Sequence, residues 1–250
     1  MSPTGRKIHE TVLKQAGLTA PVRIGILETP TGFEVNAIHG WPERMEHFFA
    51  KGLRNYKPRI TRIRAWRRDG EYSTNDRVIV DSILGQNYLY CGAGSPSYTI
   101  RHLRETRTYD LLKSFHNNGG ILSVGSATAI SLGRYALPVY EIFKVGVDLH
   151  WLDGLDFMGQ YGLNLAIVPH WNNREGEDFD TTRCYMGIDR FAILQRMLPK
   201  DVTILGLDEQ TACVVDIQSR HATVMGAGSV TVVKEWNDRV YRRGEIISFE

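Results

Sequence analysis

The first two-thirds of the chain alternate short aliphatic runs with longer stretches of helical spacing. An aliphatic run of roughly four to eight residues that is bounded by Gly, Pro, Asn or Asp is typical of a buried β-strand. Runs of this kind, which we interpret as strands, occupy residues 22–27, 60–66, 87–91, 121–125 and 163–169.

Apolar side chains recur every three or four positions in the intervening stretches, which predicts amphipathic helices. Asn75 is placed to cap one of these helices, while Pro42 is expected to break or offset another because proline has no N–H to donate. The predicted helices cover residues 34–54, 75–84, 97–104, 109–117, 127–134 and 189–198. Residues 1–20 are polar, and we interpret them as an exposed leader that contains a short helix over 7–15.

Strands that alternate with helices pair in parallel through right-handed crossovers. The pattern therefore predicts an α/β fold, a three-layer sandwich around a mostly parallel central sheet of the flavodoxin-like kind. Four short strands near the end of the chain predict a C-terminal β-meander, at residues 202–207, 212–217, 222–226 and 229–233. No low-complexity linker or internal repeat interrupts the pattern, so we expect residues 21–250 to form a single domain.

Composition and charge narrow the class of protein. Of 250 residues, 42% are apolar and 23% are charged, which is ordinary for a soluble globular chain. The formal charge of +2 gives no reason to expect a nucleic-acid partner. No apolar run approaches the ~18–20 residues of a membrane helix, and the polar start lacks the apolar core of a secretory signal. Three cysteines without a CxxC pair argue against a disulfide framework, so a cytoplasmic location is expected.

The candidate functional residues lie where predicted strands end. Open α/β sheets bind ligands outside the carboxyl ends of their strands. The run Gly92-Ala93-Gly94 follows one strand, and its glycines allow the backbone to approach a ligand. Ser126 follows the next strand and precedes a helix. Such a serine is either a nucleophile on a strained elbow or an ordinary helix N-cap. Spacing alone favours the N-cap, because Val124 and Thr128 stand where a G-x-S-x-G pattern has glycine.

His170 ends the strand at 163–169 and opens a polar loop. This position suits a general base, and it equally suits a loop histidine that bonds to backbone. The sequence offers four carboxylates to orient such a base, namely Glu141, Asp148, Asp153 and Glu209. No His, Cys, Asp or Glu spacing of a known metal motif is present, so we expect neither a metal nor a cofactor.

Several strings in a fixed order together resemble a family of serine peptidases. They are Gly92-Ala93-Gly94, Gly125-Ser126-Ala127, Pro169-His170-Trp171, the stretch GLDEQTA at 206–212 and the stretch GAGSVTV at 226–232. No single string is specific, and the weight of the match comes from the order across residues 85–235. The family includes cyanophycinase and aspartyl dipeptidase and has the class I glutamine amidotransferase-like fold.

This resemblance implies a Ser-His-acid hydrolase in which Ser126 is the nucleophile, His170 is the base and Glu141 is the acid. In that family the serine lies on a strand-to-helix elbow, and backbone N–H groups bind the oxyanion of the intermediate. The implied oxyanion donors are Ala127 and the loop glycines Gly92 and Gly94.

The chain departs from the family in two places. Thr128 replaces the usual elbow glycine, and a β-branched side chain there is expected to crowd the turn. Residues 172–177 lack the arginine-rich pattern of cyanophycinase, so cleavage of an Asp-Arg polymer is not implied. Side chains near His170 are expected to hold a substrate, with guanidinium groups gripping a carboxylate. These candidate substrate-binding residues are Asn172, Asn173, Arg174 and Arg183.

Two interpretations of function stay open. One is a serine hydrolase that cleaves a peptide or a related amide, and the other is a non-catalytic relative that binds a small molecule or peptide. A cysteine-dependent glutamine amidotransferase is disfavoured because the elbow carries serine. A dinucleotide-binding fold is disfavoured because the third glycine and the following acidic residue of its motif are missing. The sheet edge left by the tail strands is a candidate homodimer surface.

Overall fold

The computed structural model describes residues 2–235 and 237–249. The chain divides into two compact units, one made of His9–Thr128 and the other of Ser2–Ile8 with Ala129–Glu250. Two helices contribute residues to both units, namely α1 (Pro3–Gln15) and α6 (Ala127–Leu132). The expectation of a single domain from residue 21 to residue 250 stays a prediction.

The first unit contains a four-stranded sheet in which all strands run parallel, in the order β2-β1-β3-β4. Its strands are β1 (Arg23–Leu27), β2 (Arg59–Ile63), β3 (Tyr88–Cys91) and β4 (Ile121–Val124). Cys91 pairs with Leu27 on one side and with Val124 on the other. The carboxyl ends of these three strands are therefore level, and the loops that follow them start side by side.

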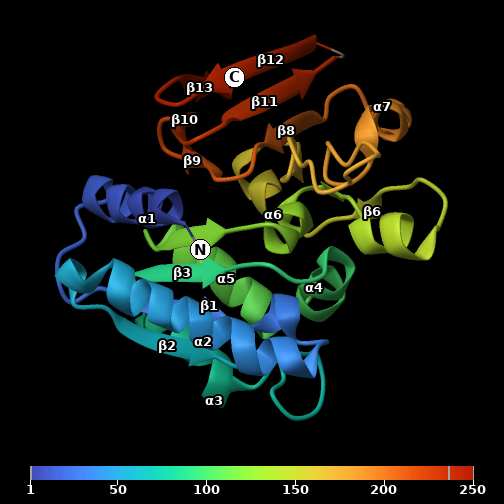
Figure 1. Cartoon of the computed structure of the whole chain (residues 1–250). Helices are drawn as coiled ribbons and strands as arrows, with labels where there is room; N and C mark the ends of the chain where they lie inside the picture. The colour runs from blue at the N-terminus through green and yellow to red at the C-terminus, as the bar shows by residue number, and fades with distance from the viewer. Residues whose placement is uncertain (1, 236, 250) are drawn as a thin grey trace. The chain divides into compact units, whose positions relative to one another are not determined.

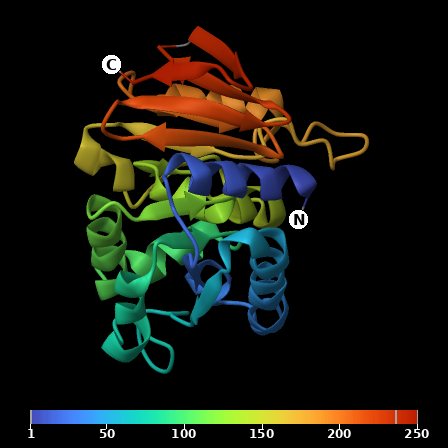
Figure 2. The same cartoon turned by 90° about the vertical axis from the view of Figure 1, so that its left-hand side faces the viewer.

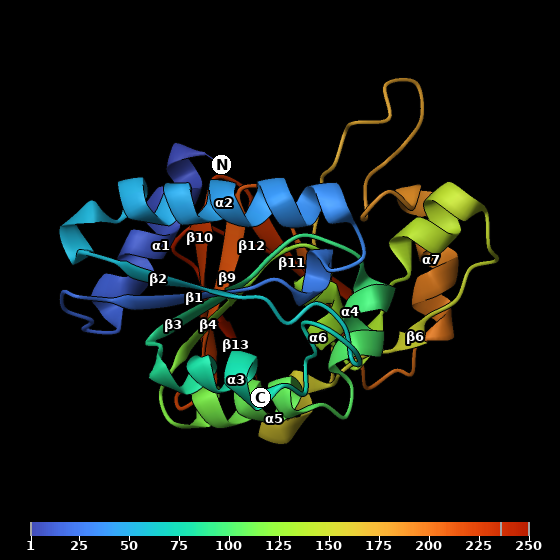
Figure 3. The same ribbon diagram turned by 90° about the horizontal axis from the view of Figure 1, so that it is seen from below.

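Helices cover both faces of this sheet, as expected for a three-layer arrangement. Figure 3 shows α2 (Val35–Gly52) along one face, and α3 (Arg77–Val80) with α5 (Arg107–Asn117) along the other. Figure 2 shows the same separation from the side. On the α2 face, Met45 and Phe49 pack against Ile24 and Tyr88 of the sheet. The helix after β3 is α4 (Pro96–Leu103).

Two sequence-based expectations about these helices are wrong in detail. Helix α2 continues through Pro42. The carbonyl that an N–H at position 42 would have served is that of Ile38, and it instead accepts a hydrogen bond from Arg62 Nη2 (3.3 Å). The N-cap of α3 is Asp76, whose side chain accepts from the N–H of Val78, while Asn75 Oδ1 accepts from the backbone of another helix.

The start of the chain is more than an exposed leader. Helix α1 is longer than predicted, and its Leu13 is fully buried. His9 of the same helix packs its ring against Phe49 and places Nδ1 2.6 Å from the hydroxyl of Tyr88. The polar composition of residues 1–20 concealed this narrow apolar face.

The second unit contains two sheets. The larger has the order β12-β11-β8-β7-β5-β6, and the smaller has the order β13-β10-β9. Leu165 and Val230 of the larger sheet share a core with Val224 and Ile247 of the smaller sheet, so the two sheets pack face to face. The strands of the second unit are β5 (Tyr135–Ala136), β6 (Leu152–Asp153), β7 (Leu165–Val168), β8 (Thr203–Leu207), β9 (Thr211–Asp216), β10 (His221–Gly226), β11 (Ser229–Lys234), β12 (Asn237–Arg242) and β13 (Ile246–Ser248).

These elements confirm the predicted fold class, an α/β fold with a mostly parallel sheet and additional antiparallel strands. The tail strands pair as antiparallel hairpins, β9 with β10 and β11 with β12 (Figure 1). The pattern did not predict the two-residue strands β5 and β6, nor β12 and β13, whose side chains are mostly exposed. The unit also contains α7 (Gly187–Met197). Short 3₁₀ turns are η1 (Thr29–Thr31), η2 (Arg54–Tyr56), η3 (Asp81–Gly85) and η5 (Phe157–Tyr161), and η4 (Glu141–Val145) is a π-helical turn.

Within the described part of the chain, no helix combines the length and the apolar character that crossing a bilayer requires.

Candidate functional site

Ser126 occupies the turn between β4 and α6 in a strained conformation. Its φ is +49°, in the left-handed region that a residue with a side chain rarely adopts. The N–H of Thr128 bonds back to the carbonyl of Gly125 (3.1 Å), which closes the turn. Left-handed backbone at a strand-to-helix turn is the conformation of a nucleophile elbow, where the strain holds the serine side chain at the top of the sheet.

Thr128 faces the protein interior instead of crowding the turn. Its side chain is buried, and its hydroxyl donates a hydrogen bond to the carbonyl of Gly92 (2.7 Å). The peptide group between Gly92 and Ala93 is planar, so its N–H points away from the carbonyl that Thr128 holds. Thr128, the residue that departs from the family pattern, thus fixes the orientation of the N–H of Ala93 in the glycine loop.

The glycine loop after β3 requires glycine for steric reasons. A Cβ on Gly92 would lie 2.4 Å from the Trp41 ring. A Cβ on Gly94, whose φ is +150°, would lie 1.8 Å from the carbonyl oxygen of Pro30. The same Pro30 carbonyl accepts from the N–H of Ser95 (3.0 Å). The loop is therefore packed closely and held by hydrogen bonds on both sides, which makes its backbone N–H groups a rigid set of donors.

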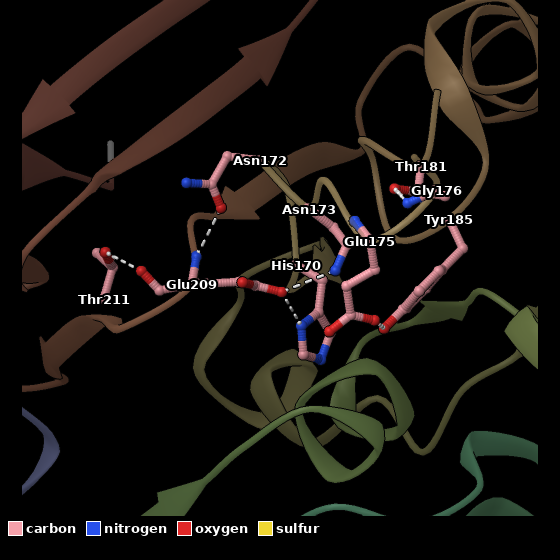
Figure 4. A network of polar contacts seen from close by, with 9 residues as sticks. All are labelled: His170, Asn172, Asn173, Glu175, Gly176, Thr181, Tyr185, Glu209 and Thr211. Carbon is pink, nitrogen blue, oxygen red and sulfur yellow. Dashed lines mark hydrogen bonds and ion pairs between the residues drawn. The ribbon is translucent and has the colours of Figure 1, made fainter. Parts of the chain in front are cut away.

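His170 lies at the carboxyl end of β7 and contacts Glu209, which lies at the carboxyl end of β8. Nδ1 of the imidazole is 3.1 Å from Oε1 of the carboxylate (Figure 4). The two strands are parallel neighbours, with Val168 opposite Gly206, so their ends bring the two residues together. His170 itself has a φ of +53°, a second left-handed residue among the candidates.

Two consecutive asparagines hold Glu209 in place (Figure 4). Asn172 Oδ1 accepts a hydrogen bond from the backbone N–H of Glu209 (2.8 Å), and Asn173 Nδ2 donates to its Oε1 (2.9 Å). Asn173 is fully buried, and its Oδ1 accepts from the N–H of Glu175 (3.0 Å). Partial burial tends to raise the pKa of Glu209, but hydrogen bonds from Asn173 and His170 outweigh it and hold the pKa below its usual value.

The loop after His170 returns to support it. Arg183, Cys184 and Tyr185 are three consecutive left-handed residues, with φ of 56°, 57° and 68°. The N–H of Cys184 donates to the carbonyl of His170 (3.1 Å), and the N–H of Arg183 donates to that of Trp171 (2.9 Å). Backbone strain of this kind persists where the surroundings enforce it, often at functional sites.

The predicted substrate contacts have the following surroundings. The guanidinium of Arg183 stacks over the Trp171 ring, 3.9 Å from its centre, and desolvation lowers its pKa. Arg174 is exposed. Asn172 and Asn173 bind Glu209 as described above. That any of these four residues contacts a substrate stays a prediction.

Two carboxylates are candidates for the acid that orients His170. Glu141, the acid implied by the resemblance, begins the π-helical turn η4, and its role stays a prediction. The carboxylate at Nδ1 of His170 is Glu209, which the sequence offered as one of four candidates. The order of the strands points to Glu209. It lies in the stretch 206–212, which covers the end of β8 and the residues after it, and β8 is the neighbour of β7, which His170 follows. Ser126 belongs to the first unit, and its cooperation with His170 stays a prediction.

Cysteine and metal chemistry receive no support from the described residues. Burial raises the pKa of each thiol to about 12, so none is a thiolate near neutral pH. The three cysteines, Cys91, Cys184 and Cys213, form no disulfide. Among the described residues, no group of three or more His, Cys, Asp or Glu side chains is arranged to hold a metal ion.

Comparison with known proteins identifies the fold. No family model matches the chain, and no curated protein matches it. The chain is similar to the crystal structure of a peptidase from an acI-B1 Actinobacterium, at 20% identity over 99% of this chain and 92% of that chain, with a TM-score of 0.76. It is also similar to a putative peptidase E protein from Listeria monocytogenes EGD-e, at 12% identity over 93% and 92% of the two chains, with a TM-score of 0.52. The chain therefore has a fold that is found in peptidases.

Proposed function

We propose that the protein is a serine hydrolase that cleaves a peptide or a related amide, with Ser126 as nucleophile, His170 as base and Glu209 as acid. The observation that carries this proposal is the hydrogen bond between His170 Nδ1 and the Glu209 carboxylate. The left-handed turn at Ser126 and the peptidase fold support it. Glu209 replaces Glu141 in the role that the resemblance implied.

The His170–Glu209 contact sets the tautomer of the base. An ionised carboxylate only accepts hydrogen bonds, so in this proposal Nδ1 carries a proton and Nε2 is the nitrogen that acts as the base. Nε2 then removes the proton of the Ser126 hydroxyl as Oγ attacks the substrate carbonyl, and later gives that proton to the leaving amine. Water hydrolyses the acyl-enzyme by the same steps.

Backbone N–H groups stabilise the oxyanion in this proposal. One is the N–H of Ala127, the residue after the nucleophile, and the other comes from the glycine loop after β3. Thr128 holds the Gly92 carbonyl away from the reacting centre, so we assign the loop donor to the N–H of Ala93 in place of those of Gly92 and Gly94.

The resemblance to the cyanophycinase and aspartyl dipeptidase group is part of the same proposal, as are a cytoplasmic location and a homodimer formed at a sheet edge. A peptide or small-molecule substrate is the partner that the site requires. Neither nucleic acid nor membrane enters the proposed activity.

The experiment combines a fluorophosphonate probe with a peptide-library assay. We expect the probe to label the wild-type protein and not Ser126→Ala, and we expect Glu209→Gln to lower kcat/KM by about 10³–10⁴-fold, as for other triad acids. Glu141→Gln is the deciding comparison and should lower kcat/KM much less. Absence of both labelling and cleavage would identify the protein as a non-catalytic binding relative, and a larger loss in Glu141→Gln would return the acid to Glu141.

A further inference from the structure

Three aromatic side chains of the second unit form a row that ends at the imidazole of His170. The ring of Phe179 lies 6.3 Å from that of Phe143, and Phe143 lies 5.2 Å from Tyr185. Tyr185 in turn lies 6.1 Å from His170. These spacings are those of interacting aromatic pairs. We call Phe179, Phe143 and Tyr185 the aromatic row.

The outer ring of the aromatic row is open to solvent. Phe179 is 60% exposed, whereas Phe143 and Tyr185 are partly buried. Two exposed apolar residues lie close to the row in sequence, Val145 (74% exposed) two residues after Phe143 and Ile188 (61% exposed) three residues after Tyr185. Single exposed apolar residues are ordinary, but a row of interacting rings that leads to a candidate catalytic base is suited to binding an apolar group.

Unusual backbone presents two of the three rings. Phe143 is carried by η4, a π-helical turn that a left-handed Gly146 ends. Tyr185 is the last of the three left-handed residues described above. Both conformations are rare, and π-helical turns and left-handed residues concentrate at functional sites because stability alone does not favour them.

The turn that presents Phe179 is rigid. Its N–H donates to the carbonyl of Gly176 (3.1 Å), and the N–H of Gly176 donates to the buried hydroxyl of Thr181 (3.1 Å). The carboxylate of Asp180 then accepts from Thr182 and from the N–H of Ile188 (2.8 Å). An exposed ring on a rigid turn binds a partner without the entropic cost of ordering a loop.

Charge near the imidazole excludes one class of substrate. Glu175 accepts a hydrogen bond from the Tyr185 hydroxyl (2.7 Å; Figure 4). Glu209 adds a second carboxylate at Nδ1 of the imidazole. Lys144 Nζ lies 4.9 Å from the centre of the Phe143 ring, farther along the row. An acidic side chain at the Tyr185 end of the row would be repelled by the two carboxylates, whereas an apolar or aromatic one would bury ring surface.

We propose that the aromatic row is the subsite for an apolar or aromatic side chain next to the bond that is cleaved. This inference rests on the proposed function and names its substrate class. The preference is opposite to one for aspartyl peptides, because the end of the row at Tyr185 and His170 offers ring surface whose hydrogen-bonding partners are two carboxylates.

Matched peptides that differ only at the residue next to the cleaved bond test this subsite. We expect wild-type kcat/KM to be at least about tenfold higher for phenylalanine than for aspartate, the range that apolar pockets achieve. Phe143→Ala should lower kcat/KM about tenfold for the phenylalanine peptide and leave the aspartate peptide unchanged, and Phe143→Leu should recover most of the loss. Val240→Ala is the matched control, since Val240 is a half-exposed apolar residue of β12 in the same unit.

A binding measurement keeps this test independent of turnover. In the Ser126→Ala background, calorimetry should show tighter binding of the phenylalanine peptide, and Phe143→Ala should abolish the difference. If nothing is cleaved but this difference in binding is present, the subsite stands and the proposed function is wrong. Equal affinity or equal cleavage of the two peptides would overturn the subsite. The subsite would also be overturned if the wild-type protein were a dimer that Phe143→Ala dissociates without a change in peptide affinity. The aromatic row would then be an interface between two copies of the chain.

Discussion

At the scale of single residues, adjacent asparagines act on different atoms of one glutamate. Asn173 donates to the carboxylate of Glu209, and Asn172 accepts from its backbone N–H. Asn173→Ala removes a hydrogen bond that lowers the pKa of Glu209, so this pKa should rise towards its usual value, whereas Asn172→Ala should leave it unchanged. An NMR titration of labelled glutamate carboxyl carbons measures both. Equal shifts in the two variants would contradict the assignment.

The same lowered pKa has a consequence for stability. Glu209 ionises more readily in the folded chain than in the unfolded one, so its contribution is complete above the unfolded pKa and is lost as pH falls through the folded pKa. The Asn173→Ala chain should therefore lose less stability than the wild type over that acidic range. Urea unfolding at a series of pH values measures this difference. The side chain is 42% exposed, so we expect the effect to be modest.

At the scale of elements, a single hydrogen bond ties the turn before α6 to the loop after β3. Thr128→Val keeps the shape of the side chain but leaves the buried carbonyl of Gly92 without its donor. We expect the free energy of unfolding to fall by about 1–3 kcal/mol. Backbone amides of residues 92–94 should exchange faster with deuterium in Thr128→Val and not in Thr128→Ser, which retains the hydroxyl. Unchanged exchange in Thr128→Val would show that the bond does not hold the loop.

Element boundaries show which information the sequence carries. Aliphatic runs located β3, β4, β7 and β8, the strands that the candidate residues follow, because a buried parallel strand needs apolar side chains on both faces. The two-residue strand β5 beside β7 was missed. The continuation of α2 through Pro42 was not predictable, since the group that satisfies the Ile38 carbonyl is Arg62 on a different element. Periodicity reports on neighbours in sequence, and such compensation comes from neighbours in space.

The same distinction between neighbours in sequence and neighbours in space decides which residues of the candidate site could be predicted. Ser126 and His170 were found because each ends a recognisable strand. Glu209 was one of four carboxylates until the order of the sheet placed β8 beside β7. The order of strands depends on the whole packing of the second unit, which no local pattern encodes.

At the scale of the whole molecule, acid should weaken the fold through His9. Burial lowers the pKa of His9 to about 4, and its Nδ1 bonds to the Tyr88 hydroxyl, beneath α2 in the core of the first unit. Between pH 6.5 and 4 the imidazole of His9 binds a proton in the unfolded chain and not in the folded one. The free energy of unfolding therefore falls as pH falls through this window, by roughly 3 kcal/mol at most. Urea unfolding should show a flatter pH dependence for His9→Gln. His221→Gln, at an exposed position, is the control, and equal curves for the two variants would contradict the prediction.

The π-helical turn that carries Phe143 is of the i→i+5 kind, which takes in one residue more than the i→i+4 turn of an α-helix. Removing one residue there would let the segment close as an α-helical turn, with the flanking residues in nearly their present directions and one side chain fewer between them. Chain length at this point therefore decides whether the turn presents this ring. Relatives with a shorter turn would lack this benzyl group beside the imidazole whatever residue they carry, and selectivity in such proteins would change through insertion and deletion as readily as through substitution.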